Sequence, residues 1–200
     1  MTFSTSAKAD PFDLLATWLA DARGTELNDP NAMTLATAGP DGAPDARIVL
    51  LKGQDDRGLV FYTNYESRKG EDLAGDSRVA LVFHWKTLQR QVRVKGVVEK
   101  VSPEEADVYF AGRPRLSKIG AWASDQSRPL ADRSVLESRL AQAEARFPTE
   151  DVARPPHWSG YRVVPHRFEF WRDMPYRLHD RLILTREAGQ DAWVTERLFP

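Results

Sequence analysis

The sequence contains no cysteine, and this absence excludes several kinds of chemistry. Disulfide frameworks, thiolate metal sites and thiol nucleophiles all require cysteine side chains. Long hydrophobic runs are also absent: no window approaches the roughly 20 apolar residues of a membrane span, and the N-terminus lacks the basic and then apolar pattern of a signal peptide. We therefore expect a cytoplasmic protein that does not bind membranes, although the missing cysteine leaves the redox compartment open.

The sequence also lacks the motifs of several enzyme classes. It has no GxGxxG, no GxxxxGKS or GxxxxGKT, no HExxH and no GxSxG segment. The four histidines are not at metal-ligand spacing, so we expect no metal site; they are His84, His157, His166 and His179. The formal net charge of -1 argues against a protein that coats nucleic acid.

Lysine is scarce: only seven of the 28 cationic residues are lysine, and 21 are arginine. Arginine forks hold phosphates and carboxylates through two parallel hydrogen bonds. Codon usage in a GC-rich genome explains a general surplus of arginine equally well. Only the positions of particular arginines therefore carry information.

The chain is long enough to build one sizeable core. With 200 residues, of which 42% are hydrophobic, it should bury roughly 70% of the surface that the unfolded chain exposes. No internal repeat and no linker rich in Pro, Gly or Ser divides it. We therefore expect a single domain over residues 1–200, with residues 1–9 as a flexible N-terminal arm.

Apolar spacing and turn residues predict a mainly β chain with helices. A first helix should begin at Pro11 after the cap Asp10 and end near Arg23, and a capping box that begins at Ser102 starts another. Further helices are expected over 103–111, 113–124 and up to Phe147, and strands over 32–38, 46–52, 59–64, 78–85, 90–101, 160–171, 181–186 and 192–198, with a turn over 53–58. This pattern favours an antiparallel barrel of the α+β class, because closure removes exposed strand edges.

Two segments place cations beside small polar residues. On one apolar strand, Arg47 and Lys52 lie five apart and point to opposite faces, so they would serve different partners. Ser67 can cap a helix whose first turn holds Arg68 and Lys69. Cations are disfavoured at the positive end of a helix dipole, and a bound phosphate would repair the local electrostatics. A solvated basic turn is the alternative interpretation.

A third segment spaces Tyr109, Arg113 and Ser117 four residues apart. On a roughly helical path, a phenol, a guanidinium and a hydroxyl would share one side and could donate to a second phosphate. Polar surface at a helix junction is the alternative.

A fourth segment near the C-terminus places Arg177, His179 and Arg181 at alternate positions. On an extended chain they share one face, where they would repel one another unless an anionic ligand or a carboxylate lay opposite. The three together indicate a binding site more strongly than a single histidine would.

These segments carry a resemblance to one known family. The motifs are RIVLLK (47–52), FYTNYESRKG (61–70), RQVRVKG (90–96), YFAGRPRLSKIGAWAS (109–124), QS (126–127), EFW (169–171) and RLHDR (177–181). On these motifs the chain resembles the pyridoxamine 5'-phosphate oxidase family over nearly its whole length, from Asp10 to Pro200. The resemblance implies an FMN-binding split β-barrel and a homodimer whose two FMN molecules lie between the subunits.

The resemblance also implies which residues act. The implied FMN contacts are Arg47, Ile48, Val49, Leu50, Leu51, Lys52, Tyr62, Thr63, Arg68, Lys69, Gln91, Gln126, Ser127, Trp171 and Arg181. The implied substrate contacts are Lys52, Tyr109, Arg113, Ser117, Arg177 and His179, of which Arg177 and His179 form the catalytic pair. Because a guanidinium rarely loses its proton, we assign Arg177 to positioning and charge stabilisation rather than to base catalysis.

The implied reaction is the oxidation of pyridoxamine or pyridoxine 5'-phosphate to pyridoxal 5'-phosphate, with FMN as cofactor, O2 as acceptor and H2O2 as product. This is a step of vitamin B6 biosynthesis or salvage. Two alternatives stay open: a flavin oxidase of the same fold that acts on another substrate, as in phenazine biosynthesis, and a non-catalytic protein that binds FMN or pyridoxal phosphate. The presence of Lys52, Tyr109, Arg113 and Ser117 together favours a phosphorylated substrate.

The chain departs from the family pattern in three places. Only nine residues precede Asp10, where family members commonly carry a longer arm that folds over the substrate. Ser159 stands where the family usually has glycine, and Tyr176 stands where a small polar residue often precedes RLH. We expect these differences to affect substrate affinity more than the reaction itself.

Overall fold

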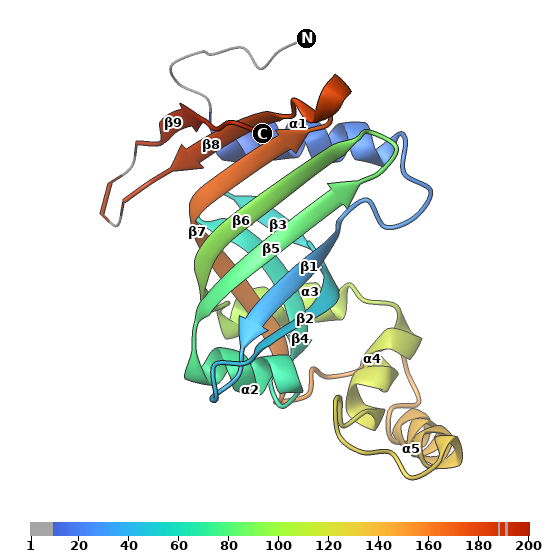
Figure 1. Ribbon diagram of the computed structural model, residues 1–200. Coiled ribbons are helices and arrows are strands. Elements are labelled where there is room, and N and C mark those ends of the chain that lie inside the picture. Colours follow the sequence, from blue (N-terminus) through green and yellow to red (C-terminus); the bar gives the residue numbers. More distant parts are fainter. Residues whose placement is uncertain (1–9, 188, 191) are drawn as a thin grey trace.

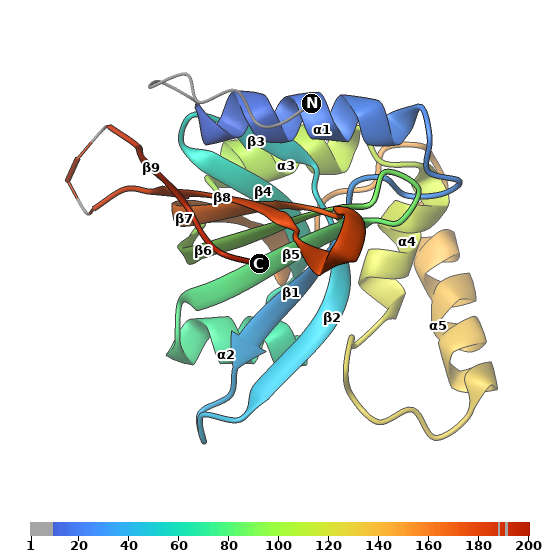
Figure 2. The same cartoon turned by 45° about the horizontal axis from the view of Figure 1, so that its top comes forward.

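The computed structural model describes residues 10–187, 189–190 and 192–200, and it shows one antiparallel sheet curled into a half-barrel (Figure 1). The arm expected over residues 1–9 lies outside the described residues. Helix α1 (Pro11–Arg23) lies across one end of the curled sheet, and α2 (Arg68–Gly75) lies at the opposite end (Figure 2). Helices α4 (Arg115–Ala123) and α5 (Arg133–Arg146) pack side by side outside the sheet.

The other elements agree closely with the sequence pattern. They are α3 (Pro103–Ala111), a 3-10 turn (Pro175–Arg177), and the strands β1 (Ala32–Ala38), β2 (Pro44–Leu50), β3 (Gly53–Asp55), β4 (Gly58–Asn64), β5 (Arg78–Trp85), β6 (Arg90–Lys100), β7 (Trp158–Arg172), β8 (Asp180–Thr185) and β9 (Val194–Arg197). The predicted helices and all eight predicted strands are confirmed to within two residues. The strand β3 occupies residues that were expected to form only a turn.

Two of three predicted helix caps are present. Asp10 Oδ1 accepts a hydrogen bond from the backbone N–H of Phe12 at 2.7 Å, and Ser102 Oγ accepts one from the N–H of Glu105 at 3.1 Å. Ser67 occupies the N-cap position of α2, but its side chain does not cap the helix. Its hydroxyl instead donates to the main-chain carbonyl of residue 64 at 2.6 Å, which turns the oxygen toward a buried ammonium group described below.

Hydrogen bonds do not close the sheet, which corrects the expectation of a closed barrel. The strand order is β2-β1-β5-β6-β7-β4-β3, and β8 and β9 continue from β7. Because β3 follows β2 along the chain, residues 51–52 join the two ends of this order, and Lys52 N–H donates to the carbonyl of Val60 at 2.8 Å. Within the described ranges, no ladder joins β2 to β4. The barrel is therefore split along these two strand edges.

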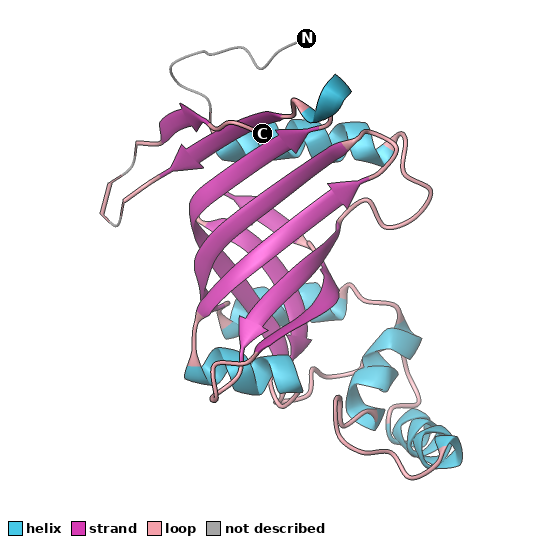
Figure 3. Ribbon diagram, in the orientation of Figure 1, coloured by secondary structure: helices cyan, strands magenta, loops and turns pink. Residues whose placement is uncertain are grey.

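The strands curl around one side of the sheet (Figure 3), and the main hydrophobic core is built from residues of these strands and of α1. Leu35, Leu81, Val94 and Phe168 lie opposite one another on four neighbouring strands and are fully buried. Successive strand residues face opposite sides of a sheet, so the sequence neighbours of these four residues point away from this core. Trp18 of α1 covers one end of this core. None of the helices in the described part of the chain is long and apolar enough to cross a bilayer.

Candidate active site

A pocket of about 620 Å³ lies at the split between β2 and β4. Helices α3 and α4, with the loop that follows α4, complete its walls. Eleven of the expected site residues line it: Ile48, Val49, Leu50, Lys52, Tyr62, Thr63, Lys69, Tyr109, Arg113, Ser117 and Gln126. The structure therefore brings the flavin contacts expected on β2, β4 and α2 together with the substrate contacts expected on α3 and α4.

Lys69 lies at one side of the pocket and is only 8% exposed. Its Nζ donates to Ser67 Oγ at 2.9 Å, to Thr63 Oγ1 at 3.1 Å and to Gln126 Oε1 at 3.2 Å, and all three acceptors are neutral. Burial, with a smaller contribution from the nearby Arg47, lowers the pKa of Lys69 from 10.5 to about 8. A buried ammonium group held only by neutral oxygens indicates a place for an anion.

Arg47 and Arg68 lie near Lys69 but do not line the pocket. Both face Asp72, a buried carboxylate on α2: Arg68 Nε is 3.3 Å from Oδ1, and Arg47 Nη2 is 3.6 Å from Oδ2. Thr37 Oγ1 also donates to Asp72 Oδ2 at 2.8 Å. Asp72 was not among the expected site residues: its spacing of one helical turn from Arg68 is compatible with an ion pair, but its contact with Arg47 on another element is visible only in the structure. Asp45 contacts Arg47 Nη2 more closely, at 2.5 Å, so Asp45 and Asp72 together hold Arg47, whereas Asp72 pairs with Arg68.

Aromatic rings also line the pocket. The rings of Tyr62 and Tyr109 stack face to face, with centroids 3.8 Å apart and planes 1° from parallel. Burial raises the pKa of Tyr62 to about 12 and also raises the pKa of Tyr109, so both phenols remain neutral donors near neutral pH. Arg113 lies next to them, and its buried Nη1 has no hydrogen-bond partner among the described residues. Trp158, another lining residue that the sequence analysis missed, contacts this arginine.

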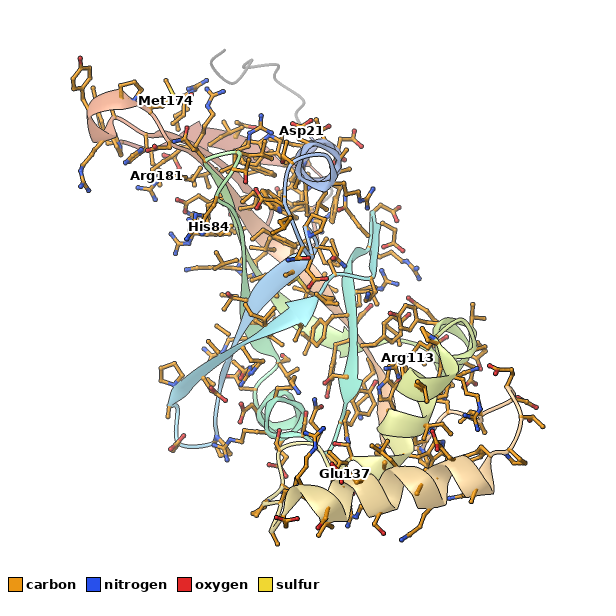
Figure 4. All side chains as sticks on the ribbon, turned by 90° about the vertical axis from the view of Figure 1, so that its right-hand side faces the viewer. Asp21, His84, Arg113, Glu137, Met174 and Arg181 are labelled. Atoms are coloured by element: carbon orange, nitrogen blue, oxygen red, sulfur yellow. The ribbon has the colours of Figure 1, made fainter. Side chains whose placement is uncertain are left out.

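A second group of expected site residues lies away from this pocket. Gln91, Trp171 and Arg181 are adjacent across β6, β7 and β8. Arg181 donates to the buried carboxylate of Glu169 through Nη2 at 2.6 Å and through Nε at 3.0 Å. Figure 4 shows Arg181 and Arg113 at well-separated positions, on different sides of the molecule. Within one chain, the structure therefore does not bring these three residues to the pocket.

The expected catalytic pair belongs to this second group. The His179 ring lies 4.7 Å from the Trp171 ring, and its Nδ1 is 2.9 Å from Asp173 Oδ1. Tyr176 and Arg177 both have a φ of 61°, a left-handed conformation that costs a non-glycine residue on the order of 1 kcal/mol or more. The backbone thus turns sharply just before His179 and leaves the Tyr176 side chain almost fully exposed.

Two further expected contacts also lie outside the pocket lining. Leu51 is buried in the main hydrophobic core, and its backbone N–H and carbonyl are both hydrogen-bonded to Asn31. Ser127 has a φ of 71° and follows Gln126, which does line the pocket. Residues next to Leu51 and Ser127 in the sequence therefore line the pocket, whereas Leu51 and Ser127 themselves do not.

Comparison with known proteins identifies the family. Residues 19–147, more than half of the chain, match the family model described as pyridoxamine 5'-phosphate oxidase. The chain belongs to the pyridoxamine 5'-phosphate oxidase family. Residues 158–200 match a second model, the C-terminal dimerisation region of pyridoxine 5'-phosphate oxidase. This region contains Glu169, Trp171 and the segment 177–181, and it supports a homodimer.

Two similar proteins are both named pyridoxine/pyridoxamine 5'-phosphate oxidase. The one from Azorhizobium caulinodans is 59% identical over 195 residues, which cover 98% of this chain and 92% of that protein. The one from Brucella canis is 56% identical over 192 residues, which cover 96% of this chain and 95% of that protein. The chain therefore spans nearly the full length of both relatives.

Solved structures agree on the fold. PhzG from Burkholderia lata, in complex with tetrahydrophenazine-1-carboxylic acid, superposes with a TM-score of 0.90 at 33% identity and covers 98% of this chain and 95% of its own. An FMN-binding protein from Nostoc punctiforme gives a TM-score of 0.78 at 16% identity, over 96% of this chain and all of its own, and so bears on the fold alone. The expected family, split-barrel fold, oxidoreductase class and FMN cofactor are confirmed by these comparisons together with the family match.

Proposed function

We propose that the protein is an FMN-dependent oxidase that converts pyridoxamine or pyridoxine 5'-phosphate to pyridoxal 5'-phosphate, with O2 as acceptor and H2O2 as product. One observation carries the proposal: a single pocket is lined by Lys69 and Arg113, two cations that come from different parts of the chain and form no ion pair with a described carboxylate. Each phosphate carries about -1.5 to -2 charges at neutral pH, so two such positions fit one cofactor phosphate and one substrate phosphate.

The residues around Lys69 fit the FMN phosphate. The buried ammonium group already meets three neutral oxygens and would gain a charged acceptor, while Asp45 and Asp72 hold Arg47 and Arg68 nearby. The free edge of β2 presents backbone groups at residues 48–50 toward the pocket, where they could bond the edge of the flavin ring. Bound FMN supplies the redox chemistry, which is hydride acceptance from the substrate and reoxidation by O2.

The residues around Arg113 fit the substrate phosphate. Lys52 and Arg113 supply charge, whereas the neutral phenol of Tyr109 and the hydroxyl of Ser117 supply additional donors. Lys52 follows β2 and the other three come from the α3–α4 region, and all four line the same pocket, so little rearrangement would be needed to gather them around a phosphate. Such preorganisation lowers the entropic cost of binding.

The second group of residues would reach the pocket from the other subunit. In a two-fold dimer, a surface that contacts a patch on its partner receives the same contact in return. We therefore place Gln91, Trp171 and Arg181 of one subunit against the flavin held by the other. Arg177 would orient the substrate ring and stabilise charge, and His179 would move a proton while Asp173 holds its Nδ1.

The proposal also covers the domain organisation, the cellular location and the metabolic role of the protein. The two matched regions share one sheet, since β7 pairs with β6 along eleven residues and with β4 along six, and this supports a single domain over residues 1–200. A cytoplasmic location and a role in vitamin B6 biosynthesis or salvage stay predictions. Cell fractionation and growth of a deletion strain without pyridoxal would test them.

The deciding experiment is anaerobic reduction of the FMN-loaded protein. We expect pyridoxamine 5'-phosphate to bleach the yellow flavin band without O2, and air to restore the band with pyridoxal 5'-phosphate formed. A bound flavin that this substrate does not bleach would favour a flavin oxidase with another substrate, as the likeness to PhzG would allow. If the protein bound no flavin at all, both the proposed oxidase function and the alternative of a flavin oxidase with another substrate would be refuted.

The lowered pKa of Lys69 predicts a pH dependence of FMN binding. An anion binds the protonated lysine, so affinity falls as pH rises through the flavin-free pKa of about 8. Above that pH, the dissociation constant should rise about tenfold per pH unit, until the raised pKa of the bound state is reached. Titration of flavin fluorescence between about pH 7 and pH 10 measures this. The K69R variant should flatten the profile, because a guanidinium stays charged over this range; an equal slope in both proteins would contradict the assignment.

A further inference from the structure

We propose that Trp158 is a positioning residue: its indole face holds the Arg113 guanidinium in place for the substrate phosphate and so determines the preference for phosphorylated substrates. The inference rests on the proposed function of the pocket. It adds a residue that the family motifs quoted above do not include.

Arg113 lies against a pair of aromatic rings, Trp158 and Phe110. Its guanidinium carbon lies 4.5 Å from the centroid of the Trp158 ring and 5.5 Å from that of Phe110. The two rings pack edge to face, with centroids 4.9 Å apart. Cations are attracted to the electron-rich face of an aromatic ring, and tryptophan attracts them most strongly. The guanidinium carbon of Arg113 therefore lies over the Trp158 ring at a distance typical of a cation–π contact.

The Trp158 ring is itself fixed. It is only 7% exposed, and its plane lies within 5° of the planes of both Tyr62 and Tyr109. At the backbone, it begins β7 opposite Asn64, and its carbonyl accepts a hydrogen bond from Arg154 Nη1 at 2.8 Å. A guanidinium resting on this ring has little freedom to move away from the pocket wall.

Arg162 shows what a structural arginine looks like in the same fold. It is buried, and its Nη1 and Nη2 donate to Asp55 at 2.6 Å and to Glu105 at 2.9 Å. Carboxylates thus occupy its in-plane donors and neutralise its charge. Arg113 forms no ion pair with any described carboxylate, and its Nη1 is buried without a hydrogen-bond partner. An aromatic face holds the cation without using the in-plane N–H groups, so these stay available to a phosphate.

The choice of an aromatic support has a consequence for specificity. Burial without a carboxylate lowers the pKa of Arg113, although a guanidinium remains charged at any physiological pH. The half-buried cation has no anionic partner among the described residues, so a substrate without a phosphate leaves its buried Nη1 uncompensated. Trp158 would therefore favour the phosphorylated vitamin over the free alcohol or amine.

The test compares W158L with W158F in the FMN-loaded enzyme. We expect W158L to raise KM for pyridoxamine 5'-phosphate about tenfold with kcat within about twofold of the unchanged protein, and W158F to recover most of the loss. Equilibrium dialysis should show the same factor in the dissociation constant of pyridoxal 5'-phosphate. The KM for unphosphorylated pyridoxamine should not rise, because that substrate makes no phosphate contact.

Two control experiments distinguish a positioning role of Trp158 from a loss of protein stability. Trp193 has a similar partner, with Arg186 4.6 Å from its ring centroid, but it does not line the pocket; W193L should lower Tm and leave KM unchanged. In an R113A background, W158L should add no further increase in KM. An equal increase with and without Arg113, or for both phosphorylated and unphosphorylated substrates, would overturn the inference.

Failure of the inference about Trp158 can be distinguished from failure of the proposed function. If the unchanged protein does not oxidise pyridoxamine 5'-phosphate, the proposed function fails. If it does, and W158L folds with an unchanged KM, only the inference fails. If W158L does not fold, W158F decides the question. Phenylalanine attracts a cation less strongly than tryptophan, so W158F should still raise KM measurably. A KM equal to that of the unchanged protein would count against the role of Trp158.

Discussion

Replacing Lys69 with methionine should weaken FMN binding about 100-fold while leaving the flavin-free protein as stable as before, or more stable. Both effects have one cause. The flavin-free protein pays to bury an ammonium group that meets only neutral oxygens, and this cost is visible in a pKa lowered to about 8. The bound phosphate compensates this charge. The free energy that burial of the lysine costs the flavin-free fold is therefore recovered when FMN binds. Equilibrium dialysis of FMN and thermal unfolding without flavin measure the two effects.

Lys118 offers a matched control, because it is equally buried at 7% exposure. Its Nζ donates to the main-chain carbonyls of Ala111 and Glu150, and so joins the end of α3 to the chain after α5. K118M should therefore lower Tm and leave the affinity for FMN nearly unchanged. A K69M protein that lost stability in the same way as K118M, with FMN affinity unchanged, would show that Lys69 is only a structural residue.

The order and type of the elements could be read from local signals. The cap Asp10, the box at Ser102 and the turn residues between apolar runs act within a few residues, so element bounds agree with the structure to within two residues. Closure of the sheet could not be read in this way. It depends on whether β2 pairs with the β4–β3 end of the sheet, and no such ladder forms among the described residues. The pocket lies at this split, where a closed barrel would have had paired strands.

The site was predictable where a residue's role follows from its chemical type. Lys69 and Arg113 sit in basic motifs, and both line the pocket. Asp72 and Trp158 were missed because their roles depend on packing: one orients arginines from a buried helix face, and the other supports a guanidinium across two segments of the chain. The separation of the 171–181 group from the pocket is also invisible in the sequence, since spacing along a chain does not say which subunit a residue serves.

Replacing Arg113 with alanine should raise KM for pyridoxamine 5'-phosphate about 100-fold, with FMN still bound. The variant removes a charged donor to the substrate phosphate, and no described carboxylate is left unpaired, because the arginine forms no ion pair in the structure. The folding cost should therefore be small. Steady-state kinetics at saturating FMN gives KM, and flavin absorbance after gel filtration gives the retained cofactor.

Arg115, two residues further along, makes the comparison specific. Its guanidinium donates to the carbonyls of Phe147 at 2.6 Å and Thr149 at 3.1 Å, so R115A should lower Tm by loosening α4 from the chain after α5, with little change in KM. R68A completes the set, because it should weaken FMN retention and leave KM at saturating FMN nearly unchanged. If R113A and R68A released flavin equally, the two phosphates would not have separate cationic positions. If R113A and R115A instead raised KM equally, the effect would come from the α3–α4 junction as a whole, and Arg113 would lose its assignment as the phosphate-binding residue.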